Sequence, residues 1–343
     1  MTTPSTTGSG PVGGDWWLDG HLDLAYLAEA GRDFTRPADP ASGCVSYPDL
    51  REAPVRIAFG TIFTEAKAPG QPGGYGDSTD VEGAHTAGVR QLDWYLEQER
   101  LGAMRIIRTV RDLEAAAADG RPSAPLGIVL LMECADPIRT PSEAAWWFGR
   151  GVRVVGMSWG YGSRYSGGNS SGGGLTALGR ELVAAFDGLG ILHDVSHLSD
   201  ASVDELLGVT TKRVVATHSN CRALLDAKER HLTDAQIRAI ADRGGVIGLN
   251  LFGKFLAVGR SPTIDDAIAH VERVADLIGR MRTCLGSDLD GGFGPEMLPP
   301  GLKHPRDYRQ LDAALARRGW SDAERLGFRH GHWMRVLRET LPR

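Results

Sequence analysis

Short apolar runs alternate with helix-like segments along most of this chain, from about residue 16 to residue 290. The runs are nearly continuous in Val, Ile and Leu and lack the polar alternation of a sheet with one wet face, which is typical of parallel strands covered on both faces. We expect eight such strands, at residues 16–22, 55–63, 126–132, 152–157, 191–196, 213–217, 245–250 and 283–287. A chain with this pattern has to bury a parallel sheet beneath helices.

The segments between the runs have recognisable helix ends. Thr233 and Gln236 form a capping box before one helix. Ser321 and Glu324 form another before a last helix, which we expect to continue to about Leu341, outside the repeat. Eight strand and helix alternations predict an α/β fold, a TIM-type (β/α)8 barrel with a C-terminal helical extension, and an open doubly wound sheet is the structural competitor.

Composition excludes several classes of protein. The 343 residues include 38 basic and 43 acidic side chains, a net charge of −5 without a block of like charges, so neither nucleic acid nor a membrane surface is an expected partner. The four cysteines lie far apart without a CxxC pair, which fits a cytoplasmic location. Residues 1–14 lack a basic start and an apolar stretch, so we expect a disordered tail followed by one domain over residues 15–343.

Polar side chains stand at the ends of five expected strands. In DGHLDL, at the end of the first strand, His21 and Asp23 are two residues apart, and residues with that spacing on a strand face the same side. Four further side chains occupy matching positions: Glu133, His197, His218 and Asp288. Because the strand ends of a barrel meet at one mouth, and because zinc and related dications accept these residue types, the pattern predicts a metal site there.

Two other features have competing interpretations. His193 lies four residues before His197, a zinc-binding spacing on a helix, but the segment ILHDVS is predicted as a strand. We therefore expect His193 to be structural, on the same face as His197 and one layer lower in the barrel. The glycine-rich segment 160–174 lacks a dinucleotide-binding spacing, and we expect a mobile lid there.

Six motifs follow one another between residues 17 and 341: DGHLDL, LLMECAD, LHDVSHLSD, ATHSN, ERHLTDAQIRAIADRGGVIGLN and LGSDLDGG. In this order they resemble the renal (membrane) dipeptidase family, within the metal-dependent amidohydrolase superfamily. The resemblance implies a dinuclear zinc hydrolase, in one barrel domain, that cleaves the amide bond of L,L and also L,D dipeptides through a hydroxide bridging the metals. Manganese or cobalt suits the same ligand types.

The resemblance also implies a ligand set. His21 and Asp23 would hold one zinc ion, and His197 and His218 would hold the other. Glu133 would bridge the pair and so belongs to both the metal site and the catalytic site.

Further roles follow from the same resemblance. Asp288 would take a proton from the bridging water and pass it to the leaving amine. Arg230 in ERHLTD matches a family arginine that binds the terminal carboxylate of the substrate. Trp159 in GMSWG stands where animal members have a histidine that polarises the substrate carbonyl, so we expect it at the substrate with that contact missing. Phe252 and His231 also depart from the family pattern and alter the pocket wall.

The expected partner is a small dipeptide, and the family precedent predicts a homodimer. Two alternatives stay open at this point. One is a dizinc amidohydrolase acting on another small amide or lactone, and the other is a metal-bearing binding protein without activity. Asp288 argues against the second, because a pure binding protein has no use for a proton shuttle.

Overall fold

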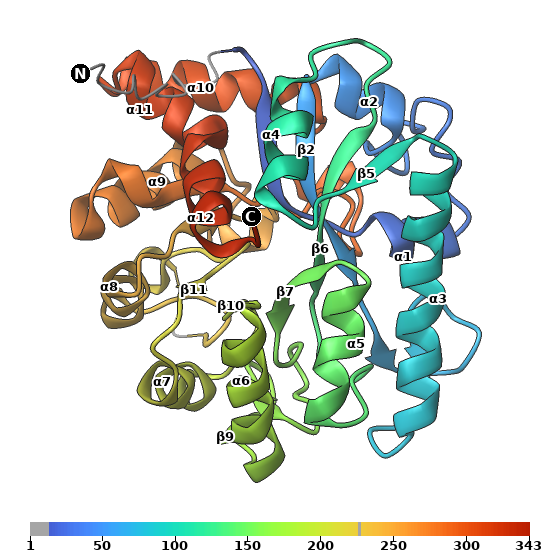
Figure 1. Cartoon of the computed structure of the whole chain (residues 1–343). Coiled ribbons are helices and arrows are strands. Elements are labelled where there is room, and N and C mark those ends of the chain that lie inside the picture. Colours follow the sequence, from blue (N-terminus) through green and yellow to red (C-terminus); the bar gives the residue numbers. More distant parts are fainter. Residues whose placement is uncertain (1–13, 226–227) are drawn as a thin grey trace, which may run out of the picture.

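The computed structural model describes residues 14–225 and 228–343, which form a parallel barrel surrounded by helices (Figure 1). The barrel strands are β1 (Trp17–Leu22), β2 (Val55–Ile62), β6 (Leu126–Met132), β7 (Val152–Gly156), β10 (Leu192–Asp194), β11 (Val214–Val215), β12 (Ile247–Leu249) and β13 (Thr283–Leu285). Each coincides with one of the eight expected strands. The tail expected at residues 1–14 lies outside the described residues except for Gly14.

Consecutive strands pair in parallel around the barrel. The main sheet has the order β1-β2-β6-β7-β10-β11, and six residue pairs join β2 to β6. A parallel bridge between Ala216 and Ile247 leads on to β12, which pairs with β13. The Asp288 amide donates to the His21 carbonyl at 3.2 Å and so links the last strand to the first. The barrel prediction is confirmed, and the open doubly wound alternative is wrong.

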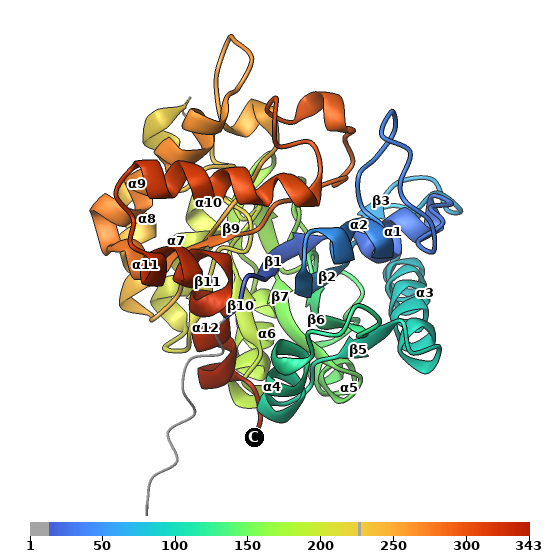
Figure 2. The same cartoon turned by 90° about the horizontal axis from the view of Figure 1, so that it is seen from above.

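Helices cover the outside of the barrel (Figure 1 and Figure 2). They are α1 (Leu24–Glu29), α2 (Tyr47–Glu52), α3 (Val81–Arg100), α4 (Val110–Ala118), α5 (Ala144–Gly149), α6 (Ala177–Leu189), α7 (Asp200–Val209), α8 (Asp234–Asp242) and α9 (Ile264–Ile278). The capping box predicted at Thr233 and Gln236 starts α8. Across residues 14–225 and 228–343, none of the helices combines the length and the apolar character that crossing a bilayer requires.

The C-terminal extension follows the last barrel strand and its helix. It consists of α10 (Tyr308–Arg317), α11 (Asp322–Leu326), a π-helical turn (Gly327–Gly331) and α12 (His332–Thr340). The helix expected from Ser321 to about Leu341 is confirmed, since helical backbone runs without a break from the predicted capping box to Thr340, and the π turn within it inserts an extra residue that changes the direction of the side chains. Trp333 Nε1 then donates to the Leu285 carbonyl at 2.9 Å. His332 Nδ1 lies 2.8 Å from the Thr283 carbonyl, so both rings are fixed to β13.

Short strands also occur outside the predicted set. β5 (Met104–Ile106) pairs with the start of β6, and β3 (Glu65–Ala66) pairs with β4 (Gly74–Tyr75). β8 (Ser166–Gly168) and β9 (Gly172–Leu175) form an antiparallel pair within segment 160–174. The segment expected to form a mobile lid therefore contains a hairpin. The Asn169 amide donates to the His197 carbonyl at 2.9 Å, so the hairpin packs against a candidate metal ligand.

Candidate metal centre

The structure brings together all six polar residues that were expected at strand ends. His21 lies in β1, and Asp23 follows it at the start of α1. The other four lie in loops that follow strands: Glu133 after β6, His197 after β10, His218 after β11 and Asp288 after β13. Five of the six are buried and His197 is slightly exposed. They gather at the carboxyl-terminal mouth of the barrel, where barrel enzymes place their active sites.

One carboxylate oxygen of Glu133 lies among three imidazoles. Its Oε1 atom is 3.2 Å from His197 Nε2, 3.5 Å from His218 Nε2 and 3.7 Å from His21 Nε2. The Nε2 atoms of His197 and His218 face each other at 3.0 Å. Three ring nitrogens and a carboxylate directed at one region form a donor set that zinc and similar dications accept.

His21 also belongs to a second group, with two carboxylates. Its Nε2 atom lies 3.7 Å from Asp23 Oδ1 and 3.9 Å from Asp288 Oδ1. The ligand atoms of these three residues lie within 4.8 Å of one another, and so do those of His21, Glu133 and His218. The two ligand groups are therefore adjacent and share His21.

Burial sets the protonation of the three imidazoles. It lowers the pKa of His21 to about 3, and the Arg230 charge acts in the same direction. It also lowers the pKa values of His197 and His218 well below their ordinary value. All three rings are therefore neutral near pH 7, the form that binds metals. Both ring nitrogens of His21 are buried without a hydrogen-bond partner among the described residues, and such nitrogens fit a metal ligand.

The three carboxylates of the cluster destabilise one another as anions. Burial raises the pKa of Asp23 to about 6. Burial and the neighbouring carboxylates raise the pKa values of Glu133 and Asp288 well above their ordinary values. Bound cations would offset this repulsion and invert the shifts, so the carboxylates fit the same site as the imidazoles.

Two neutral side chains orient the carboxylates, and we did not predict either from the sequence. The Thr61 hydroxyl donates a short hydrogen bond to Asp23 Oδ1. Asn250 Nδ2 donates to Asp288 Oδ2 at 2.8 Å. Asn250 ends one of the eight expected strands, so the rule that identified the ligands would have identified it too if amides had been included.

A relay of polar groups orients His218. Its Nδ1 atom lies 2.9 Å from Thr217 Oγ1, and the Thr217 hydroxyl donates to Asp194 Oδ2 at 2.6 Å. These contacts turn Nε2 of the ring toward Glu133, which is the usual role of residues behind a metal ligand. Asp194 and Thr217 were also missed, although both stand within three residues of a predicted ligand.

His197 lies on a loop and not on a strand. β10 ends at Asp194, and His197 has a φ of 70°, while Asp288 has a φ of 60°. Such left-handed backbone costs about 1–3 kcal/mol in a residue other than glycine and is concentrated at functional sites. His193 Nε2 lies 2.7 Å from Asp187 Oδ1, so its structural role is confirmed. The prediction that His193 and His197 share a face is wrong, because side chains alternate between faces only within a strand and His197 lies beyond the end of β10.

Arg230 is a fixed cation beside the ligands. It is 5% exposed; Nη2 donates to the His218 carbonyl at 2.9 Å, and Nη1 donates to Ser219 Oγ at 3.0 Å. Its Nε atom is buried and has no partner in the described part of the chain. The guanidinium therefore has a donor available for an anion near the cluster.

A pocket of about 370 Å³ opens onto the cluster. Asp23, Glu133, His197 and Asp288 line part of it. Most of the other lining side chains are aromatic: Tyr26, Phe63, Trp159, Phe252, Phe255 and Phe293. The Trp159 ring lies 5.6 Å from the His197 ring, so the structure places this residue at the pocket.

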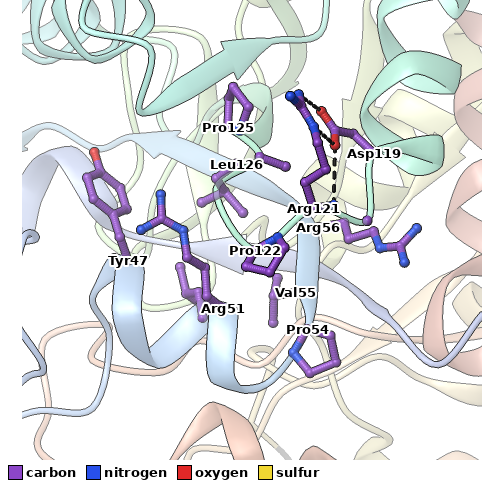
Figure 3. Close-up of a pocket in the computed structure, with 13 residues that line it drawn as sticks. Tyr47, Arg51, Pro54, Val55, Arg56, Asp119, Arg121, Pro122, Pro125 and Leu126 are labelled. Carbon is purple, nitrogen blue, oxygen red and sulfur yellow. Dashed lines mark hydrogen bonds and ion pairs between the residues drawn. The ribbon is translucent and has the colours of Figure 1, made fainter.

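A second pocket, of about 240 Å³, lies near the other end of the barrel (Figure 3). Pro54 and Val55 at the start of β2 and Leu126 at the start of β6 line it. Arg121 and Asp119 at its edge form an ion pair at 2.6 Å. None of the six candidate ligands contributes to its lining, so this pocket is separate from the candidate metal centre.

A parallel barrel with imidazoles and carboxylates gathered at the carboxyl ends of its strands defines a class, the metal-dependent barrel hydrolases. The chain belongs to the membrane dipeptidase family, peptidase family M19, whose profile matches residues 16–341. It is therefore a hydrolase of a metal-dependent peptidase family.

The chain is also similar to solved structures and to curated sequences. A crystal structure described as dipeptidase AC, a metallopeptidase of family M19, has a TM-score of 0.84 at 25% identity, and the match covers 96% of this chain and 99% of that one. A metallopeptidase from Rhodobacter sphaeroides, liganded with a phosphinate mimic of L-Ala-D-Ala, has a TM-score of 0.82 at 24% identity, with 95% and 99% covered.

An uncharacterized protein in the pqqA 5′ region of Klebsiella pneumoniae is 34% identical over 207 residues, which is 56% of this chain and 74% of that protein. Dipeptidase 3 of Rattus norvegicus is 29% identical over 171 residues, 49% of this chain, and the match spans only 33% of the rat protein.

Proposed function

We propose that this protein is a dinuclear zinc dipeptidase that hydrolyses the amide bond of L,L and L,D dipeptides. The observation that supports it best is the pair of ligand groups around His21, whose ring nitrogens lack partners among the described residues. Membership of the membrane dipeptidase family supports the substrate class. The L,D part rests on the family resemblance.

The donor set fits two cations. His21 and Asp23 would hold one, His197 and His218 would hold the other, and Glu133 would lie between them. When bound, two zinc ions lower the pKa of a shared water and polarise the scissile carbonyl. The mixture of imidazoles and carboxylates suits zinc, and manganese or cobalt suits the same ligands.

Asp288 is assigned the proton transfer. Its Oδ2 atom is held by Asn250, while its Oδ1 atom faces His21 at 3.9 Å, so one oxygen is oriented and the other faces the ligand cluster. From there the carboxylate takes the proton of the attacking water and donates it to the leaving amine nitrogen. The left-handed backbone of Asp288 is consistent with a position selected for function.

Arg230 is assigned the terminal carboxylate of the substrate. Its guanidinium is fixed by the His218 carbonyl and the Ser219 hydroxyl, and it keeps a buried donor at Nε. A planar cation with parallel donors matches a carboxylate and holds the scissile bond in register with the metal ligands.

Hydrolysis of a dipeptide panel by the zinc-loaded enzyme tests this proposal. Dipeptides with a free carboxylate are expected to be cleaved, and their methyl esters should lose about 100-fold or more in kcat/KM because Arg230 is left without its anion. Undiminished cleavage of the esters, or preferential cleavage of other amides or lactones, would support the amidohydrolase alternative.

The Asp288→Asn variant separates an enzyme from a binding protein. Its kcat is expected to fall about 10²- to 10⁴-fold, the usual contribution of a general acid–base group. Two results together would instead identify a metal-bearing binding protein: the zinc-loaded protein cleaves nothing in the panel, and Asp288→Asn binds the ligand with the same affinity as the parent.

A further inference from the structure

We propose that the enzyme is specific for dipeptides with aromatic or other large apolar side chains, and that Phe252 selects the C-terminal residue while Trp159 selects the amino-terminal residue. The inference rests on the proposed dipeptidase function and adds the substrate class. Two clusters of aromatic rings that line the pocket support it.

The first cluster, here called the tryptophan wall, consists of Tyr26, Phe63 and Trp159. The ring centroids of Tyr26 and Phe63 are 5.7 Å apart, and those of Phe63 and Trp159 are 5.4 Å apart, both edge to face. The three residues come from α1, the end of β2 and the loop after β7. This wall stands beside His197, whose ring is 5.6 Å from Trp159.

The second cluster, here called the phenylalanine wall, consists of Phe252, Phe255 and Phe293. Its ring centroids lie 4.8 Å apart for Phe252 and Phe255 and 4.4 Å apart for Phe252 and Phe293. These residues come from the loops after β12 and β13. The guanidinium carbon of Arg230 lies 5.0 Å from the Phe255 ring, so this wall stands beside the carboxylate anchor.

The two anchors assign each wall to one residue of the substrate. A carboxylate on Arg230 places the C-terminal residue against the phenylalanine wall. With the scissile carbonyl at the metal ligands, the amino-terminal residue then extends toward His197 and the tryptophan wall. A substrate ring inserted at either wall can adopt the offset or edge-to-face contacts that aromatic pairs prefer, at about 4.5–7 Å between centroids.

The charges of the pocket disfavour acidic side chains. Among the described residues, the lining includes no lysine or arginine. Beyond the metal cluster, its one charged residue is Glu65. Glu65 is already paired with Lys67 at 3.1 Å. With Arg230 occupied by the terminal carboxylate, an acidic substrate side chain would therefore lose its water without gaining a cation, which is costly. Uncharged, large side chains fit the lining best.

Steady-state kinetics of the zinc-loaded full chain test the proposal with Ala-Ala, Ala-Phe, Phe-Ala, Ala-Asp and Asp-Ala. We expect kcat/KM for both phenylalanine substrates to exceed that for Ala-Ala by about tenfold or more, and both aspartate substrates to fall below Ala-Ala. Phe252→Ala should abolish the advantage of Ala-Phe and keep that of Phe-Ala, and Trp159→Ala should do the reverse. Trp146→Ala removes an indole from α5, outside the pocket, and should keep both ratios.

Binding gives a second readout. Calorimetry with phosphinate mimics of Ala-Phe and Ala-Ala should show about tenfold tighter binding of the Ala-Phe mimic, and Phe252→Ala should remove the difference. Three results would each overturn the proposed specificity. They are equal affinities for the two mimics, equal kcat/KM for Ala-Ala and the phenylalanine substrates, and a uniform loss of kcat/KM across the panel in both variants. Cleavage of Ala-Ala would leave the proposed function standing in these cases, whereas no cleavage of any dipeptide would overturn both.

Discussion

His21 joins the two ligand groups and has the least satisfied side chain in the cluster. Its Nε2 atom faces Asp23, Glu133 and Asp288 at 3.7–3.9 Å, yet neither ring nitrogen has a hydrogen-bond partner in the described residues. Leaving buried donors and acceptors unpaired costs about 1–3 kcal/mol each. A cation at Nε2 would satisfy that nitrogen and offset the charge of the carboxylates.

Arg230→Lys tests the carboxylate anchor. Lysine keeps the charge but not the planar fork, so kcat/KM for dipeptides with a free carboxylate should fall roughly 10- to 150-fold, the value of a hydrogen bond to a charged group. Kinetics with the matching methyl ester provide the reference, and the ester should change little. Equal losses on acid and ester would show that Arg230 supports the His218 carbonyl and not the substrate.

The candidate ligands could be predicted from the sequence, because each follows an apolar run and the ends of barrel strands meet at one mouth. His218 and Glu133 are far apart in the chain and only 3.5 Å apart in the structure. Thr61 and Asn250 escaped prediction because neutral polar residues near strand ends are common, and only the folded chain shows which ligand each one contacts.

β1 contains a glycine where another element approaches closely. A Cβ atom on Gly20 would lie 2.8 Å from the Trp333 ring and 2.9 Å from the Leu285 carbonyl. Gly20→Ala should therefore lower the free energy of unfolding by about 1–3 kcal/mol, the usual cost of overpacking. Denaturant unfolding measures it, with Gly188→Ala in α6 as the control.

A Cβ atom on Gly188 meets nothing within 4 Å, so alanine there should stabilise the protein by about 0.5–1 kcal/mol through helix propensity. Equal free energies of unfolding for Gly20→Ala and Gly188→Ala would contradict the close contact between α12 and β1.

His332, the first residue of α12, should make the stability of the protein depend on pH. His332 is 7% exposed, and burial lowers its pKa to about 4. The folded pKa lies below the unfolded value of about 6.5, so the unfolded chain binds the extra proton, and stability falls as the pH drops from 6.5 through 4. The loss from this residue amounts to about 3 kcal/mol. His332→Gln in metal-free protein should flatten the slope of unfolding free energy against pH, and parallel slopes would contradict it.

The π turn before α12 and the β8–β9 hairpin were the elements that the sequence predicted least well. Each is determined by a distant partner, since His332 and Trp333 bond to β13 and the Asn169 amide bonds to the His197 carbonyl. Periodicity reports which face of a segment is apolar and not which distant carbonyl it meets, so neither the π turn within the predicted helix nor the hairpin was predicted.

The helix that closes the core and the residues of the candidate site lie at opposite ends of the barrel. α12 covers one end of the barrel with Trp333 in the core, and the ligand cluster and aromatic pocket occupy the other end. The barrel was predictable because eight apolar runs of suitable length leave few other ways to bury a parallel sheet. The cytoplasmic location, the homodimer and the single domain over residues 15–343 stay predictions.

Zinc content per folded chain tests the dinuclear site most directly. After zinc loading and removal of free metal, we predict two zinc ions per chain in the parent protein. His218→Ala should retain one or fewer, because it removes a ligand that lies 3.0 Å from His197 Nε2. A folded parent protein that retains no zinc, or a His218→Ala variant that retains as much as the parent, would contradict the dinuclear site.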